Sequence, residues 1–150
     1  MKDIFCLSNK KALVTGGMGD IGFAISKGLV DILSVNEDEV KRYGKINNQK
    51  EAIDYLSKWV RVDLHTQDYV KSVYNNKESG QIPTFNIKPK RLTGAGDAWN
   101  AGDIFGETIG LSDNLRLMLA NALAAYYISD SDGRHPTKKE LIKFLEGVSF

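Results

Sequence analysis

T-G-A-G-D-A-W-N-A-G, residues 93–102, combines a run of small residues with a carboxylate at the predicted start of a helix. Small residues let backbone N–H groups approach a ligand closely. A helix N-terminus adds partial positive charge and unpaired donors, which suit phosphate. The segment therefore predicts a phosphate site at Gly94, Ala95 and Gly96, with Asp97 placed to accept a proton from an attacking hydroxyl. The alternative is a glycine-rich helix start whose Asp only caps the helix.

The composition narrows the fold and the partners of the chain. A length of 150 residues with 42% hydrophobic residues fits one domain with a packed core. With 20 basic and 19 acidic residues, the net charge of +1 gives no electrostatic case for nucleic acid or a membrane surface. No apolar run reaches the length of a membrane span, no secretory signal opens the sequence, and the single Cys6 excludes an internal disulfide. We expect a cytoplasmic protein whose partner is at most a small-molecule nucleotide or phosphate, with the oligomeric state left open.

The hydrophobic pattern alternates strands and helices. Strands are predicted at residues 12–15, 30–35 and 60–64, and a β-hairpin at 69–74 and 82–87 around a turn at 75–80. Helices are predicted at residues 21–27, 39–43, 50–58, 96–109, 113–129 and 138–145, with a capping box from Thr137 to Glu140 and a cap at Ser112 or Asp113. This order predicts a single α/β domain over residues 1–150. We expect three layers (αβα), a mostly parallel Rossmann-like sheet and C-terminal helices.

The segment 93–102 resembles the second signature of the ribokinase-like (PfkB-type) carbohydrate and nucleoside kinases. The resemblance implies that Asp97 is the catalytic base and that the amides of Gly94, Ala95 and Gly96 form an anion hole for the transferred phosphoryl group. Residues 31–39 resemble the family's strand that ends in N-x-x-E. The resemblance implies that Asn36 and Glu39 organise Mg²⁺ and phosphate, and an amide and a carboxylate suit this hard ion. Taken alone, N-x-x-E is also a common way to begin a helix.

The resemblance continues to the end of the chain, with departures. The helix 115–129, with Asn121, resembles the family's late helix beside the adenine, so Asn121 is a candidate cofactor-binding residue and ATP with Mg²⁺ the implied cofactors. The family's Asp-Thr before the signature is replaced by Arg91 and Leu92. In the family, the nucleotide-binding strand continues as T-x-G-x-x-G, but the segment 64–69 contains no glycine. Thr66 is therefore the one candidate phosphate contact in this segment. His65 and His135 have no ligand partner at useful spacing and are interpreted as polar surface residues.

A second glycine-rich loop, at residues 15–22, follows a predicted strand and opens a predicted helix. Residues 4–29 resemble the start of a short-chain dehydrogenase, which makes Gly16, Gly17 and Gly22 candidate cofactor-binding residues. Asp20 stands where the family has a glycine and opposes a pyrophosphate. No tyrosine has a lysine four positions later, so the family's Y-x-x-x-K catalytic pair is absent. NAD(P) is therefore less expected than ATP, although Glu37 and Asp38 lie at the distance of a ribose-binding acid.

The two resemblances meet near residues 27–30, inside one βαβ unit. Kinases of this family are about twice as long, and their first half carries the sugar-binding residues. We interpret the chain as a designed chimera, with residues 1–29 dehydrogenase-like and residues 30–150 kinase-like. Positioning of the substrate can supply ~7–11 kcal/mol of catalysis, so we expect no native function and no detectable phosphoryl transfer, with at most vestigial nucleotide or phosphate binding. The alternatives are an active ATP-dependent sugar or nucleoside kinase with Asp97 as base, and an NAD(P)-binding module.

Overall fold

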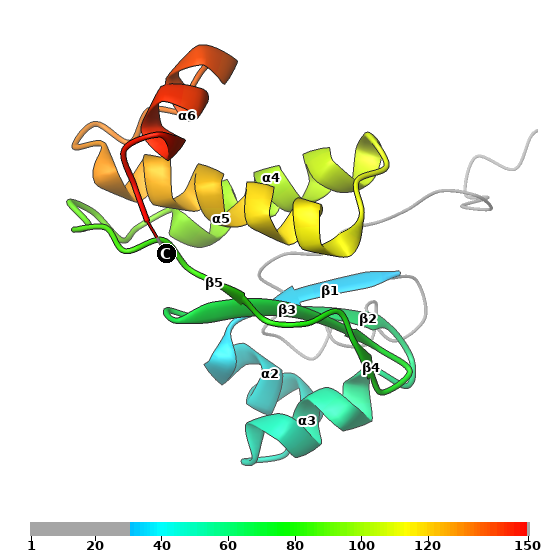
Figure 1. Cartoon of the computed structure of the whole chain (residues 1–150). Coiled ribbons are helices and arrows are strands. Elements are labelled where there is room, and N and C mark those ends of the chain that lie inside the picture. The colour runs from blue at the N-terminus through cyan, green and yellow to red at the C-terminus, as the bar shows by residue number, and fades with distance from the viewer. Residues whose placement is uncertain (1–30, 150) are drawn as a thin grey trace, which may run out of the picture. The chain divides into compact units, whose positions relative to one another are not determined.

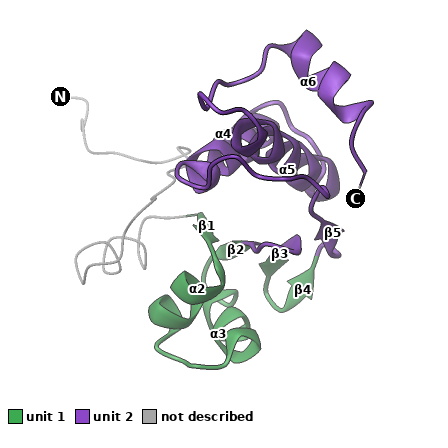
Figure 2. Ribbon diagram, turned by 90° about the vertical axis from the view of Figure 1, so that its left-hand side faces the viewer, with its two compact units in different colours: residues 1–64, 73–78 green, residues 65–72, 79–150 purple. Residues whose placement is uncertain are grey.

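The structure is a computed structural model that describes residues 31–149. The predicted strand 12–15, the helix 21–27 and the loop 15–22 lie outside the described residues. The elements follow one another as β1–α2–α3–β2–β3–β4–β5–α4–α5–α6 (Figure 1). The chain divides into two compact units (Figure 2). The described part of unit 1 holds residues 31–64 and 73–78, and that of unit 2 holds residues 65–72 and 79–149.

Unit 1 is built on a parallel pair of strands. β1 (Ile32–Val35) pairs with β2 (Arg61–His65), and Val35 lies opposite Leu64. Parallel neighbours need a crossover connection, which α2 (Glu37–Gly44) and α3 (Gln49–Leu56) supply. The core consists of apolar side chains from all four elements, namely Leu33, Val35, Val40, Ala52, Ile53, Leu56, Val62 and Leu64.

Tight turns close unit 1. Gly44 lies so near α3 that a Cβ there would stand 3.0 Å from Cβ of Ala52. β3 (Tyr69–Tyr74) and β4 (Lys77–Glu78) form an antiparallel hairpin through Asn75 and Asn76, whose φ angles are 54° and 58°. A two-residue turn with two positive φ angles matches the twist of the strands, and Asn tolerates it. The predicted turn 75–80 is thus made by its first two residues, and Asn75 N–H donates to the Ser57 carbonyl at 2.7 Å.

In unit 2, the predicted strand 82–87 is shorter than expected. β5 is only Ile82–Pro83, which pairs antiparallel with the start of β3. Pro83 has no N–H to extend the ladder. The next amides bond elsewhere, because Thr84 N–H donates to the Asp68 carbonyl at 3.0 Å and Asn86 N–H to that of Ser149 at 2.8 Å. Over the described residues the sheet is therefore mixed, and the predicted α/β class is confirmed.

Three helices complete unit 2: α4 (Ala95–Thr108), α5 (Asp113–Ser129) and α6 (Lys138–Leu145). α4 and α5 run side by side (Figure 1). Two glycines one turn apart allow this, since a Cβ at Gly102 would stand 2.7 Å from Cα of Ala120 and one at Gly106 2.9 Å from Cγ of Arg116. The core of this contact consists of Val70, Trp99, Leu117 and Ala120, flanked by Ile82 and Ala124.

A buried charge network, which no sequence pattern predicted, joins α4 to α5. Arg116 is fully buried and forms an ion pair with the buried Asp103. Asp113 accepts from the same guanidinium at 3.2 Å, and Glu107 lies 3.7 Å from Nε. Because burying a charge is costly unless it is paired, this network ties the two helices to one register.

Of the two helix caps predicted from the sequence, one forms its hydrogen bonds. Thr137 and Glu140 form the capping box of α6, in which Thr137 N–H donates to Oε2 of Glu140 at 2.7 Å. Ser112 is the N-cap residue of α5, but its side chain makes no capping hydrogen bond. None of the helices in the described residues has both the length and the apolar character needed to cross a membrane.

Candidate phosphate-binding site

The helix predicted at the small-residue run is present as α4. Gly94 is the N-cap residue with φ 88°, and no side chain caps this helix end. Ala95 N–H donates to the Leu92 carbonyl at 3.1 Å, and the Gly94 carbonyl accepts from Ala98. The N–H groups of Gly96 and Asp97 have no acceptor among the described residues. Two amide donors therefore remain for an anion at the positive end of the helix dipole.

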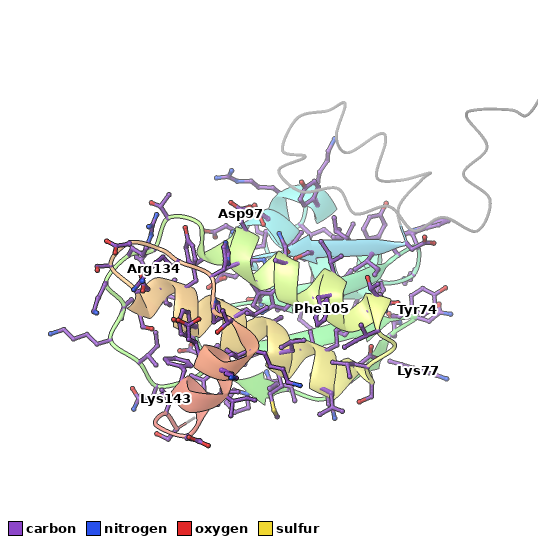
Figure 3. All side chains as sticks on the ribbon, turned by 90° about the horizontal axis from the view of Figure 1, so that it is seen from above. Tyr74, Lys77, Asp97, Phe105, Arg134 and Lys143 are labelled. Carbon is purple, nitrogen blue, oxygen red and sulfur yellow. The ribbon has the colours of Figure 1, made fainter. Side chains whose placement is uncertain are left out.

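Asp97 lies in the first turn of α4 and is exposed (Figure 3). The space beside Gly96 is open, because the nearest atom to a Cβ there would be Cε1 of His65 at 4.0 Å. The ring of His65 packs on Trp99 with centroids 4.9 Å apart. A ligand at these amides would thus have a carboxylate at its side and an imidazole near the same helical turn.

The side chain of Tyr127 packs directly against the backbone of Gly94 and leaves no room for a side chain there. A Cβ at Gly94 would stand 2.5 Å from Oη of Tyr127. The Tyr127 ring stacks on His135, with centroids 5.1 Å apart, and the Arg91 guanidinium lies 5.0 Å from its centroid. Arg91, which departs from the kinase pattern in the sequence, is therefore a neighbour of the predicted anion hole.

Asn36 and Glu39 lie in unit 1, where they form the capping box of α2. Oδ1 of Asn36 accepts from Glu39 N–H at 2.9 Å, and Asn36 N–H donates to Oε2 of Glu39 at 3.0 Å. The N-x-x-E segment thus begins a helix, which is the alternative to a magnesium site that the sequence analysis named. Burial raises the pKa of Tyr43 in the same helix, and the negative charge of Glu39 raises it further. The described residues contain no group of three or more His, Cys, Asp or Glu side chains that could hold a metal ion.

Asn121 is buried inside unit 2, with both ends of its amide engaged. Oδ1 accepts from the Trp99 indole at 3.0 Å, and Nδ2 donates to the Pro83 carbonyl at 3.0 Å. Thr66 is likewise engaged, since its hydroxyl donates to the Tyr69 carbonyl at 2.8 Å and accepts from the amides of Asp68 and Tyr69. These two candidates thus hold structure locally. The candidates Gly16, Gly17 and Gly22 lie outside the described residues.

Two carboxyl groups, those of Asp38 and Asp130, have lowered pKa values. A hydrogen bond from Lys41, 2.9 Å away, lowers the pKa of Asp38 in the first turn of α2. In the loop after α5, a hydrogen bond from Arg134 lowers the pKa of Asp130. Both carboxylates are therefore held in the charged form by a basic neighbour.

The fold is that of one part of the ribokinase-type sugar kinases. The ribokinase of Arabidopsis thaliana, solved with ribose and ATP, gives a TM-score of 0.75 at 21% identity over 89% of this chain and 46% of that chain. The adenosine kinase of Sinorhizobium meliloti gives 0.71 at 20% identity over 85% of this chain and 39% of that one. A ribokinase II candidate from E. coli, solved with ATP and Mg²⁺, gives 0.74 at 19% identity over 85% and 42%.

The chain spans less than half the length of each of these structures. At these identities the likeness concerns the fold alone. No protein-family model and no curated protein matches the sequence.

Proposed function

We propose that the chain binds the phosphate groups of a nucleotide at the start of α4, through the amides of Gly96 and Asp97. The observation that carries the proposal is the uncapped helix start, where Gly94 has a positive φ and two N–H groups lack an acceptor among the described residues. Backbone donors at a helix N-terminus favour anions. The fold supports the same reading, because neighbours with this fold were solved with ATP.

Asn36 and Glu39 are proposed to hold a hydrated Mg²⁺. The capping box occupies Oε2 of Glu39, and the half-buried carboxylate keeps its second oxygen for water or an ion. Mg²⁺ keeps several of its waters and needs few direct protein ligands. The ion would supply positive charge, and Glu39 would orient its water shell.

Phosphoryl transfer is proposed to be absent or vestigial. Asp97 is exposed beside the amides, as a base that meets an incoming hydroxyl must be. However, the chain covers less than half the length of the neighbours, so a complete kinase activity does not follow from the likeness of the fold. We also keep the proposal that residues 1–29 and 30–150 have separate origins in a designed chimera.

Isothermal titration with ATP and Mg²⁺ tests the binding site. In Gly96→Ala the new Cβ enters open space in front of the amides, so affinity should fall severalfold while the fold persists. Gly147→Ala is the matched control, since a Cβ there makes only ordinary contact, at 3.7 Å, with the Phe144 carbonyl. Equal affinity in both variants would reject this site.

A coupled assay of ADP release tests the alternative of an active kinase. If a sugar or nucleoside stimulates ADP release strongly, and Asp97→Asn abolishes this, the chain is a kinase with Asp97 as base. Titration with NAD tests the remaining alternative, a dinucleotide-binding module. Saturable NAD binding that Gly96→Ala leaves unchanged would favour that module.

A further inference from the structure

A series of contacts in unit 2 runs from the loop after α5 to the start of α4. The Arg91 guanidinium lies against Gly133, where a Cβ would stand 2.6 Å from Cζ of Arg91. It also lies 5.0 Å from the ring centroid of Tyr127. Tyr127 in turn touches Gly94, where a Cβ would stand 2.5 Å from Oη. Gly94 and Gly133 both have positive φ angles, 88° and 67°, so both ends of the series need glycine.

Packing rather than hydrogen bonding holds the Arg91 guanidinium in this series. Nε of Arg91 is buried and has no hydrogen-bond partner among the described residues. A cation over an aromatic face is attracted by the ring quadrupole. The backbone keeps Arg91 in place, because its N–H donates to the Ile128 carbonyl at 3.3 Å. An ion pair between Asp130 and Arg134, 3.0 Å apart, closes the loop that carries Gly133.

We propose that Arg91 and Tyr127 are positioning residues for the anion site: they hold Gly94 in its left-handed conformation and so aim the Gly96 and Asp97 amides. Gly94 is the last residue before α4, so its φ sets the direction in which the first helical amides point. The inference rests on the proposed phosphate site. It also gives a role to Arg91, which stands where the kinases that this chain resembles have an acidic residue.

Nuclear magnetic resonance of the full chain tests the proposal, with inorganic phosphate as the probe. The variants are Arg91→Met, which removes the guanidinium and keeps an apolar stem, and Tyr127→Leu, which removes the ring. Lys88→Met is the charge-matched control, since Lys88 is exposed and makes none of these contacts. Tyr127→Phe is the conservative variant that keeps the ring.

Without phosphate, we expect the amide shifts of residues 94–97 to move in Arg91→Met and Tyr127→Leu, and to stay near the parent values in Lys88→Met. Tyr127→Phe, which keeps the ring but removes Oη, should move them less than Tyr127→Leu. With phosphate, affinity should fall about three- to fivefold in Arg91→Met, the size expected from losing a cation–aromatic contact. Lys88→Met should change it less than about twofold.

Two results would overturn the inference. One is Arg91→Met with parent-like shifts at residues 94–97. The other is an equal loss of affinity in Arg91→Met and Lys88→Met, which would reduce Arg91 to a general charge. If the parent itself binds no phosphate, the proposed function fails, but the ligand-free shifts still decide whether Arg91 positions Gly94. A variant that loses its native spectrum is replaced by Arg91→Lys, for which shifts between those of the parent and Arg91→Met are expected and parent-like shifts count against the inference.

Discussion

The Trp99 indole N–H donates to Oδ1 of Asn121 at 3.0 Å, from the second turn of α4 to the middle of α5. Both side chains are buried, with exposed fractions of 3% and 4%. The other end of the Asn121 amide reaches the Pro83 carbonyl in β5. One side chain thus satisfies a donor on α4 and an acceptor on β5, which fixes the helix that begins at the proposed anion site.

Replacing Asn121 by Leu should therefore destabilise the protein by about 1–3 kcal/mol, because the indole N–H and the Pro83 carbonyl lose their partners. Urea denaturation gives the free energy of unfolding. Trp59 is 69% exposed, so a Trp59→Phe background lets the fluorescence report on Trp99 alone. An unchanged midpoint and an unchanged Trp99 emission would contradict this role. A direct contact between Asn121 and a nucleotide stays a prediction.

Breaking the buried ion pair should cost more. Asp103→Ala leaves the Arg116 charge buried with one partner fewer, and we expect a loss of about 3–5 kcal/mol in the free energy of unfolding. The double variant Asp103→Leu/Arg116→Met removes both charges and should lose clearly less than the single variant. Chemical denaturation of the two variants checks this. A double variant that is as unstable as Asp103→Ala would contradict it.

Local signals predicted most of the helices. The bounds of α5 and α6 agree with the sequence prediction, because a 3.6-residue apolar period and the capping box at Thr137 are written in adjacent residues. The positive φ at Gly94 also follows from local chemistry. The pairing of Asp103 with Arg116, and the contact of Arg91 with Tyr127, join residues far apart in sequence. Neither has a periodic signature, so neither could be predicted.

The capping role and the proposed magnesium role of Glu39 can be separated. Glu39→Gln keeps a side chain that can complete the capping box but removes the charge that would favour Mg²⁺. We expect a Mg²⁺ titration to lose its chemical-shift response at residues 36–39, while stability falls by about 0.3–1 kcal/mol at most. Glu37→Gln removes the same charge from the same helical turn outside the box, and serves as control. An identical Mg²⁺ response in Glu39→Gln and the parent would rule out the magnesium role.

The cap of α6 should depend on pH. Hydrogen bonds from Thr137 lower the pKa of Glu140 from its usual 4.5. A lowered pKa in the folded state means that the cap stabilises α6 fully above pH 4.5 and that this contribution is lost as the pH falls through the lowered value. The protection factors of the α6 amides, measured by hydrogen exchange and NMR and corrected for the pH dependence of intrinsic exchange, should therefore fall in acid. Glu140→Gln can keep the box without titrating, so its exchange should show no such step; a step of equal size would contradict this origin.

The central claim is that phosphate binds at the start of α4, and a titration of the ¹⁵N-labelled chain with inorganic phosphate tests it most directly. Gly96 and Asp97 offer amides that have no acceptor among the described residues, at a helix start, whereas from the sequence we expect Asp20 to oppose an anion at the other glycine-rich loop. We predict saturable shifts of the amides of residues 94–97 and none at residues 16–22. Shifts confined to residues 16–22, or no saturable shift at residues 94–97, would contradict the account.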